Sequence, residues 1–270
     1  MTTPVALTIA GSDSSGGAGI QADLKTFAAF GVYGTSAVTA VTAQNTKGVS
    51  AWEPVSTELV IAQIETVASD IPPSAVKTGM LATAAIVEAV AATNEELELP
   101  NLVVDPVMVA KGGQRLLHDD AVAALVAELL PRAEVITPNI PEAEALVGFP
   151  VRTLDDMREA ARRIRKLGPR VVVLKGGHLP PSGSDPGVCT DVVSSALGDF
   201  DVRGPLVASR HTHGTGCTFA AAITAALALG QPMEQAIRGA RDFVEGAIRD
   251  APEIGSGHGP LNHFWAGILK

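Results

Sequence analysis

Short apolar stretches that alternate with amphipathic stretches of helical length constrain this chain most strongly. The first unit is the apolar run VALTIAG at 5–11, and a helical pattern follows it from Ile20 to Phe30. Regular alternation of this kind is typical of right-handed βαβ units, which build a mainly parallel sheet covered by helices on both faces. The sequence therefore predicts a three-layer α/β/α fold, formed as a single domain over residues 1–270.

The same alternation continues to the end of the chain. Further strands are predicted at 35–43, 75–81, 102–108, 133–139, 170–177 and 188–195, the last two as a hairpin-like edge pair. Further helices are predicted near 57–70, 83–93, 119–130, 142–147, 153–167, 233–249 and 261–269, and a long one is predicted within 211–227. The segment 178–187 is rich in Pro, Gly and Ser, which predicts a surface loop.

Composition narrows the class of protein. Hydrophobic residues make up 46% of the chain and aromatic residues only 4%, so the core must be built from Ala, Val, Leu and Ile. A net charge of −9 argues against nucleic acid or an anionic membrane as the main partner. Because no stretch has the pattern of a signal peptide or a membrane span, we expect a cytosolic protein. The two cysteines lack the spacing of a zinc site.

The stretch HTHGTGCTFAAAITAAL at 211–227 combines a glycine turn with the start of a helix. Gly214 and Gly216 allow positive φ and close approach of a ligand, and Thr215 offers a hydroxyl beside the first amides of the helix. A helix N-terminus attracts phosphate and lowers the pKa of a cysteine placed there. We therefore expect an anion site in which Cys217 serves as a base or covalent partner, with a structural cysteine as the alternative.

Polar residues follow several predicted strands, at the edge where ligands bind in α/β sheets. Gln44 ends one strand, Asp105 another, and Asn139 and Glu142 follow a third. Their oxygens suit Mg²⁺ and its water shell, although each could instead cap a helix. Lys175 ends a further apolar strand before two glycines and could reach a polyphosphate, or could simply be solvated.

The first loop, GSDSSGGAG at 11–19, contains neither GxGxxG nor GxxxxGK[ST]. This argues against a nicotinamide cofactor and against a Walker-type phosphate loop. It favours close approach of a small flat ligand, with a plain turn as the alternative. Asp23 is expected in the first turn of the following helix, near this loop. His211 and His213 lack the spacing of a helical metal pair, and we expect at most a substrate contact from them.

Taken together, these motifs resemble one family over almost the whole chain, from residue 5 to residue 264. The motifs that carry the resemblance are GSDSSGGAGIQADLKTF, VTAVTAQNT, KTGML, VVDPVMVAKGG, TPNIPEAE, VVLKGGH, HTHGTGCTFAAAI and GHGPLNH. The chain resembles the hydroxymethylpyrimidine/phosphomethylpyrimidine kinases of thiamine biosynthesis, in the ribokinase-like superfamily. It departs from the usual first loop at Ser15, where glycine is expected.

The resemblance implies phosphorylation of 4-amino-5-hydroxymethyl-2-methylpyrimidine and then of its monophosphate, with ATP and Mg²⁺, by a homodimer. The resemblance implies that catalysis takes place at Gly214, Thr215, Gly216 and Cys217. It implies that the pyrimidine is hydrogen-bonded to Gln44 and Asp23 and lies in a ring site lined by Gly11, Met80 and Val107. It also implies nucleotide contacts from Lys175, Asp191 and Asn139, and magnesium bound at Asp105 and Glu142. The wider superfamily has GAGD at the catalytic turn, with aspartate as base, where this chain has Cys217.

Two other functions remain open from the sequence. One is a pyridoxal kinase, because members of the family with this turn accept that ring and a cysteine could add reversibly to its aldehyde. The other is a catalytically silent sensor of pyrimidine or thiamine precursors. Gln44 favours a ligand with amino and ring-nitrogen groups over pyridoxal, and the phosphate- and metal-binding residues argue against a sensor.

Overall fold

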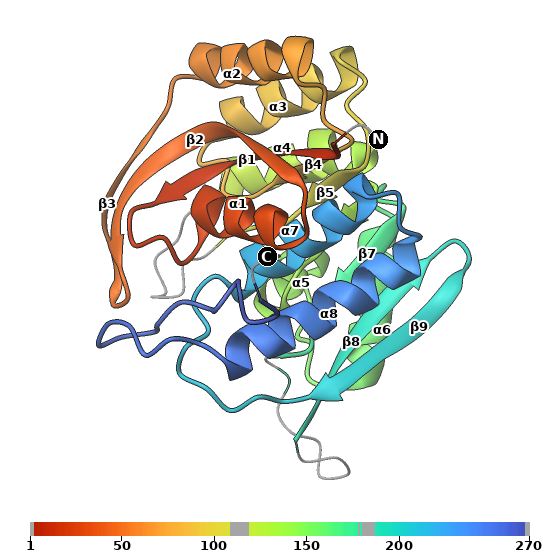
Figure 1. Ribbon diagram of the computed structural model, residues 1–270. Coiled ribbons are helices and arrows are strands. Elements are labelled where there is room, and N and C mark those ends of the chain that lie inside the picture. The colour runs from red at the N-terminus through yellow and green to blue at the C-terminus, as the bar shows by residue number, and fades with distance from the viewer. Residues whose placement is uncertain (1–2, 109–118, 178, 180–186, 268–270) are drawn as a thin grey trace.

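The computed structural model describes residues 3–108, 119–177, 179 and 187–267 (Figure 1). Most of the loop predicted at 178–187 lies outside the described residues. A nine-stranded sheet runs through the molecule. Its strands are β1 Val5–Asp13, β2 Tyr33–Asn45, β3 Gly48–Pro54, β4 Ala75–Thr78, β5 Leu102–Val104, β6 Val135–Ile136, β7 Val171–Leu174, β8 Val188–Ser195 and β9 Gly198–Pro205.

The order of the strands places a ligand-binding edge at the middle of the sheet. They lie in the order β3-β2-β1-β4-β5-β6-β7-β8-β9. Every pair from β2 to β7 is parallel, whereas β3, β8 and β9 pair antiparallel with their neighbours. The prediction of a mainly parallel sheet is confirmed. Strand β2 lies on one side of β1, and β4 lies on the other side. The carboxyl ends of these strands therefore border a crevice.

Helices cover both faces of the sheet (Figure 1). One face carries α1, α7 and α8, and the other carries α2 to α6. Their bounds are α1 Gly19–Ala29, α2 Thr57–Asp70, α3 Ala84–Glu96, α4 Asp119–Ala124, α5 Ile140–Val147, α6 Leu154–Arg165, α7 Thr215–Ala228 and α8 Met233–Arg249. The predicted three-layer α/β/α arrangement is therefore confirmed.

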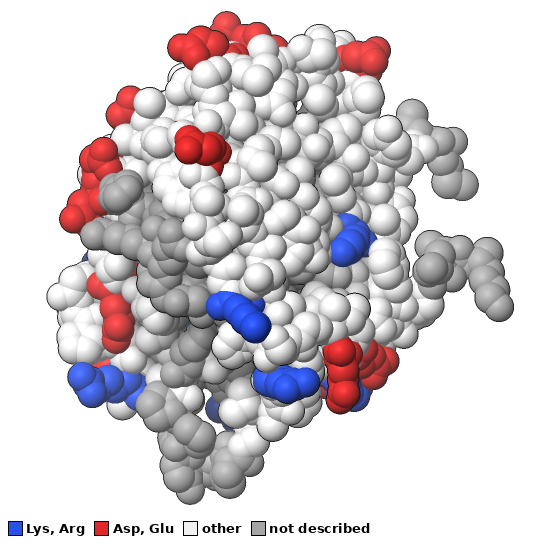
Figure 2. All heavy atoms as spheres, turned by 90° about the vertical axis from the view of Figure 1, so that its left-hand side faces the viewer, with Lys and Arg blue, Asp and Glu red and all other residues white. Residues whose placement is uncertain are grey.

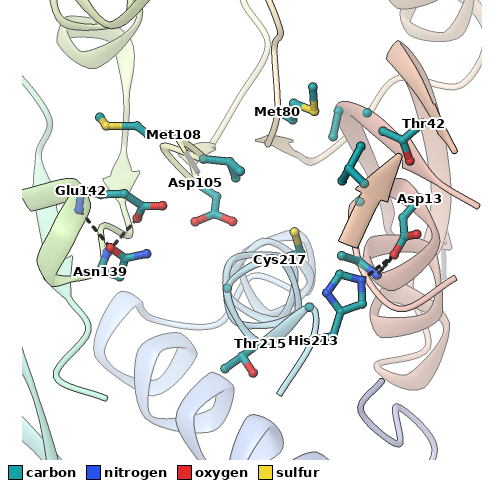
Figure 3. Close-up of a pocket in the computed structure, with 18 of the residues that line it drawn as sticks. Asp13, Thr42, Met80, Asp105, Met108, Asn139, Glu142, His213, Thr215 and Cys217 are labelled. Carbon is teal, nitrogen blue, oxygen red and sulfur yellow. Dashed lines mark hydrogen bonds and ion pairs between the residues drawn. The ribbon is translucent and has the colours of Figure 1, made fainter. Parts of the chain in front are cut away.

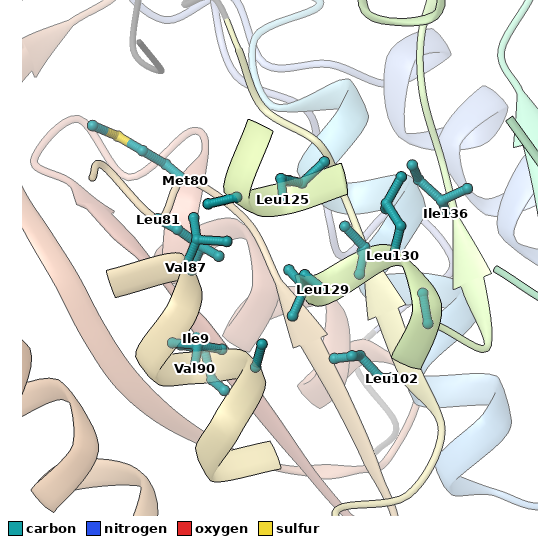
Figure 4. Close-up of a cluster of buried hydrophobic side chains, with 14 of the residues drawn as sticks. Ile9, Met80, Leu81, Val87, Val90, Leu102, Leu125, Leu129, Leu130 and Ile136 are labelled. Carbon is teal, nitrogen blue, oxygen red and sulfur yellow. The ribbon is translucent and has the colours of Figure 1, made fainter. Parts of the chain in front are cut away.

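Successive residues of each central strand pack into different helical layers. In β1, Ala6 contacts the layer of α1, α7 and α8, while Leu7 contacts the opposite layer. In β6, Val135 and Ile136 divide in the same way. This period of two follows from the pleat of a strand, and a parallel sheet needs apolar side chains on both faces. Figure 4 shows part of the cluster on the α3 side, with Leu125 and Leu129 packed near Val87.

Helix α7 is buried along most of its length. Every residue from Thr218 to Ala228 is buried, and the helix packs against α1, α8, β4 and β5. Its many alanines let its backbone approach these neighbours closely, since a methyl side chain adds little width. The sheet and the neighbouring helices therefore fix the direction in which the N-terminus of α7 points.

Some elements differ from the prediction. Strands β3 and β9 were not predicted, because each is mostly exposed or half-buried and their polar sequences lack the apolar alternation of a core strand. Residues 261–267 form turns rather than the predicted helix, and Trp265 is held there by a hydrogen bond that its Nε1 donates to the Phe243 carbonyl. The helix predicted near 119–130 continues as a π-helical turn, Leu125–Leu129, and a 3-10 turn, Leu130–Arg132.

No helix among the described residues is both long and apolar enough to cross a membrane.

Gly214, in the turn before α7, has no space for a side chain. Gly214 has φ of 85°, and a Cβ added there would lie 1.9 Å from the carbonyl oxygen of Gly17. Gly230 has a similar φ of 75° but no atom within 4 Å of an added Cβ. We expect Gly230→Ala to cost about 1 kcal/mol of unfolding free energy through backbone strain alone. Gly214→Ala should cost at least about 2 kcal/mol more. Equal losses in urea denaturation would contradict the close contact.

Candidate functional site

A cavity of about 790 Å³ opens at the carboxyl ends of the parallel strands. The end of β2 and the loops after β1, β4, β5, β6 and β7 contribute to its wall, and the N-terminus of α7 closes one side (Figure 3). Most of the residues singled out in the sequence meet here although they are far apart in the chain. The lining residues from that set are Gly11, Gln44, Met80, Asp105, Val107, Asn139, Glu142, Lys175, His213, Gly214, Thr215, Gly216 and Cys217.

The N-terminus of α7 forms an anion-binding corner of the cavity. The first amides of an α-helix have no acceptor within the helix, and the helix dipole adds positive charge at this end. A Cβ built on Gly216 would lie 3.4 Å from Lys175 Nζ and 3.5 Å from Asp105 Oδ2. The absence of a side chain at Gly216 therefore keeps the helix terminus accessible next to the Lys175 ammonium, as a phosphate would require.

Acidic side chains lie opposite α7. Asp105 is almost fully buried, its Oδ1 lies 3.3 Å from Lys175 Nζ, and its Oδ2 has no hydrogen-bond partner. Burial raises the pKa of Glu142 to about 7, Lys175 opposes this effect, and the charge of Asp105 adds to it. A buried carboxylate oxygen without a partner costs free energy, so this corner is suited to an added cation.

Asn139 and Glu142 also cap α5. Asn139 Oδ1 accepts from the Glu142 amide at 3.0 Å, and Glu142 Oε2 accepts from the Asn139 amide at 2.8 Å, which is a capping box. Both residues therefore cap the helix, as the alternative from the sequence predicted, and both also line the cavity. No group of three or more His, Cys, Asp or Glu suited to a metal occurs in the part of the chain that the structure describes. Asp105 and Glu142 form a pair, and Mg²⁺ often takes only one or two protein carboxylates.

The remaining wall of the cavity is mostly apolar, with a few polar atoms. Met80, Val107 and the backbone of Gly11 line it with apolar groups, and Thr42 and Gln44 add a hydroxyl and an amide. The Met80 sulfur would lie only 3.3 Å from a Cβ at Gly11, so glycine there keeps this wall open. The wall fits a small ring with polar substituents at its edge.

The glycine-rich loop after β1 does not offer its amides to a phosphate. The Asp13 carboxylate accepts hydrogen bonds from the amides of Ser15, Gly17 and Ala18 at 2.8, 3.1 and 2.8 Å. Its Oδ2 also lies 2.8 Å from Nε2 of His213, and both side chains are buried. These loop amides are therefore occupied within the protein, and we assign the phosphate corner to the N-terminus of α7.

Two residues that were expected to touch ligands lie outside the cavity wall. Asp23 is fully buried, pairs with Lys77 Nζ at 2.9 and 3.0 Å, and accepts from Thr8 Oγ1 at 2.6 Å. Asp23 sits in the second turn of α1, and its side chain enters the core beside Lys77, which itself lines the cavity. A contact of Asp23 with the pyrimidine stays a prediction.

Asp191 is the other residue of this kind. Its Oδ1 accepts from the Gly176 amide at 2.8 Å, and its Oδ2 pairs with Arg241 at 3.0 Å. The strand periodicity of β8 directs this carboxylate into the protein and away from the cavity. Asp191 therefore holds the backbone next to Lys175 and does not line the nucleotide side itself.

Cys217 lies where the sequence predicts it, in the first turn of α7 facing the cavity (Figure 3). The pKa of its thiol is raised, whereas the sequence predicted a lowered pKa. Desolvation raises the pKa of the thiol to about 12, although the charge of Lys77 and the Gly19 amide act in the other direction. Burial outweighs the helix terminus because a thiolate here would face Asp23 and Asp105 as well.

Sequence reasoning missed several lining residues, of which Lys77, Asp13 and Thr42 matter most. Lys77 is fully buried in β4, and a lysine inside an otherwise apolar strand is itself a signal of a paired charge. Asp13 gave no signal apart from its place in the first loop, because its main partner, His213, is 200 residues away.

A phosphate corner with a lysine and an acidic pair, facing a wall for a small ring, defines a kinase of small molecules. The comparisons agree with this class. A model of the family described as phosphomethylpyrimidine kinase matches residues 13–262, and the chain belongs to this family.

Known proteins resemble the chain over nearly its full length. The hydroxymethylpyrimidine/phosphomethylpyrimidine kinase of Bacillus subtilis is 50% identical over 259 residues, which cover 96% of this chain and 94% of that protein. The pyridoxal kinase of Bacillus subtilis, solved as an ADP complex, has a TM-score of 0.89 at 40% identity, covering 98% of this chain and 99% of that one. The phosphomethylpyrimidine kinase of Clostridium difficile has a TM-score of 0.79 at 43% identity, covering 90% and 99%.

The raised pKa of Cys217 generates a chemical prediction. With a pKa of about 12, on the order of one thiol in 10⁴ to 10⁵ is ionised near pH 7.5, and only the thiolate is alkylated quickly. We expect iodoacetamide to modify the Cys217 peptide slowly at neutral pH, with a rate that rises about tenfold per pH unit up to pH 10. Peptide-level mass spectrometry measures this rate. A rate that levels off between pH 6 and 8 would show a low-pKa thiol instead.

Proposed function

We propose that this chain transfers the γ-phosphoryl group of ATP to the hydroxymethyl oxygen of 4-amino-5-hydroxymethyl-2-methylpyrimidine, and then phosphorylates the resulting monophosphate to the diphosphate. The observation that carries the proposal is the placement of the anion-binding terminus of α7 beside the ring-sized wall in one cavity. Membership of the phosphomethylpyrimidine kinase family supports it, as does the likeness to the Bacillus subtilis hydroxymethylpyrimidine/phosphomethylpyrimidine kinase.

The protein contributes mainly position and charge to this transfer. The amides of Gly216 and Cys217 and the Lys175 ammonium neutralise charge on the transferring group. Gln44 orients the aminopyrimidine edge, while Met80 and Val107 hold the ring. Because desolvation keeps the Cys217 thiol neutral, we assign Cys217 a positioning role beside the acceptor oxygen. The new O–P bond forms as the bond between the γ-phosphorus and ADP breaks, and the hydroxyl proton then passes to solvent water.

Mg²⁺ is the cofactor that the site fits. Asp105, with its unpartnered Oδ2, and Glu142 are the residues that would hold it. When bound, Mg²⁺ supplies positive charge that neutralises the phosphate oxygens of the nucleotide.

We also propose a homodimer that forms through the side of the molecule carrying β3. On this side an area above the centre carries few charged side chains, and charged side chains surround it (Figure 2). Val41 in β2 has more than half of its surface exposed, and a partner molecule on this side would cover it.

Pyridoxal phosphorylation is the second candidate. It is favoured by the TM-score of 0.89 to the pyridoxal kinase of Bacillus subtilis. A sensor without catalysis has less support, because a pure binder needs neither the Lys175–Asp105 pair nor the anion-binding terminus of α7.

A direct assay separates these functions. We expect turnover of hydroxymethylpyrimidine and of its monophosphate with ATP, and a kcat/KM for pyridoxal that is lower by at least about tenfold. Phosphorus NMR would follow the monophosphate and the diphosphate as they appear, and coupled ADP release would give the rates. Absence of the diphosphate would remove the second transfer, a preference for pyridoxal would reverse the assignment, and ligand binding without ADP release would support the sensor.

Two glutamates of α5 provide a matched test of the magnesium site. Glu142 is buried and lines the cavity, whereas Glu144 does not line it and accepts a hydrogen bond from the Val151 amide. We expect Glu142→Gln to lower kcat about tenfold and to weaken Mn²⁺ binding in the presence of ADP, measured by electron paramagnetic resonance. Glu144→Gln should leave both nearly unchanged. Equal metal binding in the two variants would exclude Glu142 from the site.

A further inference from the structure

Asp13, His213 and Gln44 form a network on the ring side of the cavity, and Asp13 and His213 have no part in the proposed transfer. Nε2 of His213 lies 2.8 Å from Asp13 Oδ2 and 3.2 Å from Nε2 of Gln44. The other end of the Gln44 amide, Oε1, lies 3.3 Å from Thr42 Oγ1. Asp13, Thr42 and His213 are at least nine-tenths buried. The network therefore connects the glycine-rich loop, β2 and the turn before α7.

The protonation of His213 follows from its partners. Burial opposes ionisation of Asp13, but hydrogen bonds from His213 and Ser15 outweigh this effect and lower the pKa of its carboxyl. Asp13 Oδ2 also accepts from the amides of Gly17 and Ala18. A carboxylate with these donors can only accept, so the Nε2 atom of His213 must carry a proton and donate it to Asp13.

The orientation of the Gln44 amide then follows. With the Gln44 nitrogen facing His213 Nε2, two hydrogen-bond donors would meet at 3.2 Å, which is unfavourable. The oxygen and nitrogen of an amide have almost the same shape, so their hydrogen-bond partners decide which is which. Turning the amide places its oxygen beside this N–H, so that the single Nε2 proton of His213 is shared between Asp13 at 2.8 Å and the Gln44 oxygen at 3.2 Å.

Thr42 favours the same orientation. The Thr42 hydroxyl donates its single proton to the Ser12 carbonyl at 2.9 Å. Its oxygen can therefore accept from the Gln44 nitrogen at the other end of the amide. Each end of the turned amide thus meets a complementary partner.

We propose that the Asp13–His213 pair determines substrate specificity by holding the Gln44 amide with its oxygen toward His213 and its nitrogen toward Thr42. This fixes the order in which Gln44 offers an acceptor and a donor to the ring. The matching ligand is a heteroaromatic ring with an amino group next to a ring nitrogen, which presents a donor beside an acceptor. The inference rests on the proposed function, for which it names how the ring is recognised.

Close packing holds His213 in this position. A Cβ at Gly17 would lie 2.5 Å from His213 Cδ2 and 3.3 Å from Pro260 Cβ. The His213 amide also donates to the Gly259 carbonyl at 3.1 Å. The imidazole ring therefore has little freedom to rotate, as expected of a group that orients another side chain.

The test compares His213→Met, which keeps a similar volume but has no donor, with His213→Gln, which keeps an N–H that can reach Asp13. The substrates are hydroxymethylpyrimidine and 5-hydroxymethyl-2-methylpyrimidine, which lacks the amino group. We expect His213→Met to raise the KM for hydroxymethylpyrimidine about tenfold and to reduce discrimination between the two substrates by a similar factor. The KM for ATP should change less than twofold, and His213→Gln should restore most of the discrimination.

Thr42→Val removes the partner at the other end of the Gln44 amide and provides a second, nearly isosteric variant. It should reduce the same discrimination about threefold or more. Calorimetric titration with hydroxymethylpyrimidine alone should show weaker binding in both variants. Unchanged discrimination in His213→Met or Thr42→Val, failure of His213→Gln to restore it, or a parallel rise in the KM for ATP would overturn the inference. Failure of the proposed function differs, because the unmodified protein would then not phosphorylate hydroxymethylpyrimidine.

Discussion

The contact between the turn before α7 and the loop after β1 holds the site together. Gly214 has no side chain, so its backbone lies directly against the Gly17 carbonyl, and His213 and Asp13 join the same two segments. This contact brings the phosphate corner at α7 within one cavity of the ring wall built by β1 and β2. Phosphoryl transfer needs its two substrates held close together. The buried, alanine-rich body of α7 makes that arrangement rigid.

The fold was largely predictable because local patterns determine it. Apolar runs that end in polar residues indicated β1, β2 and β4 to β8, and helical periodicity indicated α1 to α8. Strands β3 and β9 carried no such signal, since pairing with a neighbour and not burial holds them in the sheet. The turns at 261–267 depend on distant contacts, such as that of Trp265 with Phe243, which a local pattern does not contain.

The site was predictable where a residue's place at a strand end fixes its direction, as for Gln44, Asp105 and Lys175. It was less predictable where direction depends on packing. Asp23 and Asp191 carry suitable charges, yet both face internal partners. The ionisation of Cys217 shows the same limit, because burial among acidic groups outweighs the effect of the helix terminus. The single-domain boundary and the cytosolic location stay predictions.

In the proposed mechanism the terminus of α7 binds the phosphates and the wall around Gln44 binds the ring. A crystal structure with ADP and hydroxymethylpyrimidine would show both contacts. We expect phosphate oxygens within hydrogen-bond distance of the Gly216 or Cys217 amide, and the pyrimidine amino group and adjacent ring nitrogen against the Gln44 amide. Phosphates bound instead by the loop at 11–19, or a ring placed away from Gln44, would contradict this mechanism.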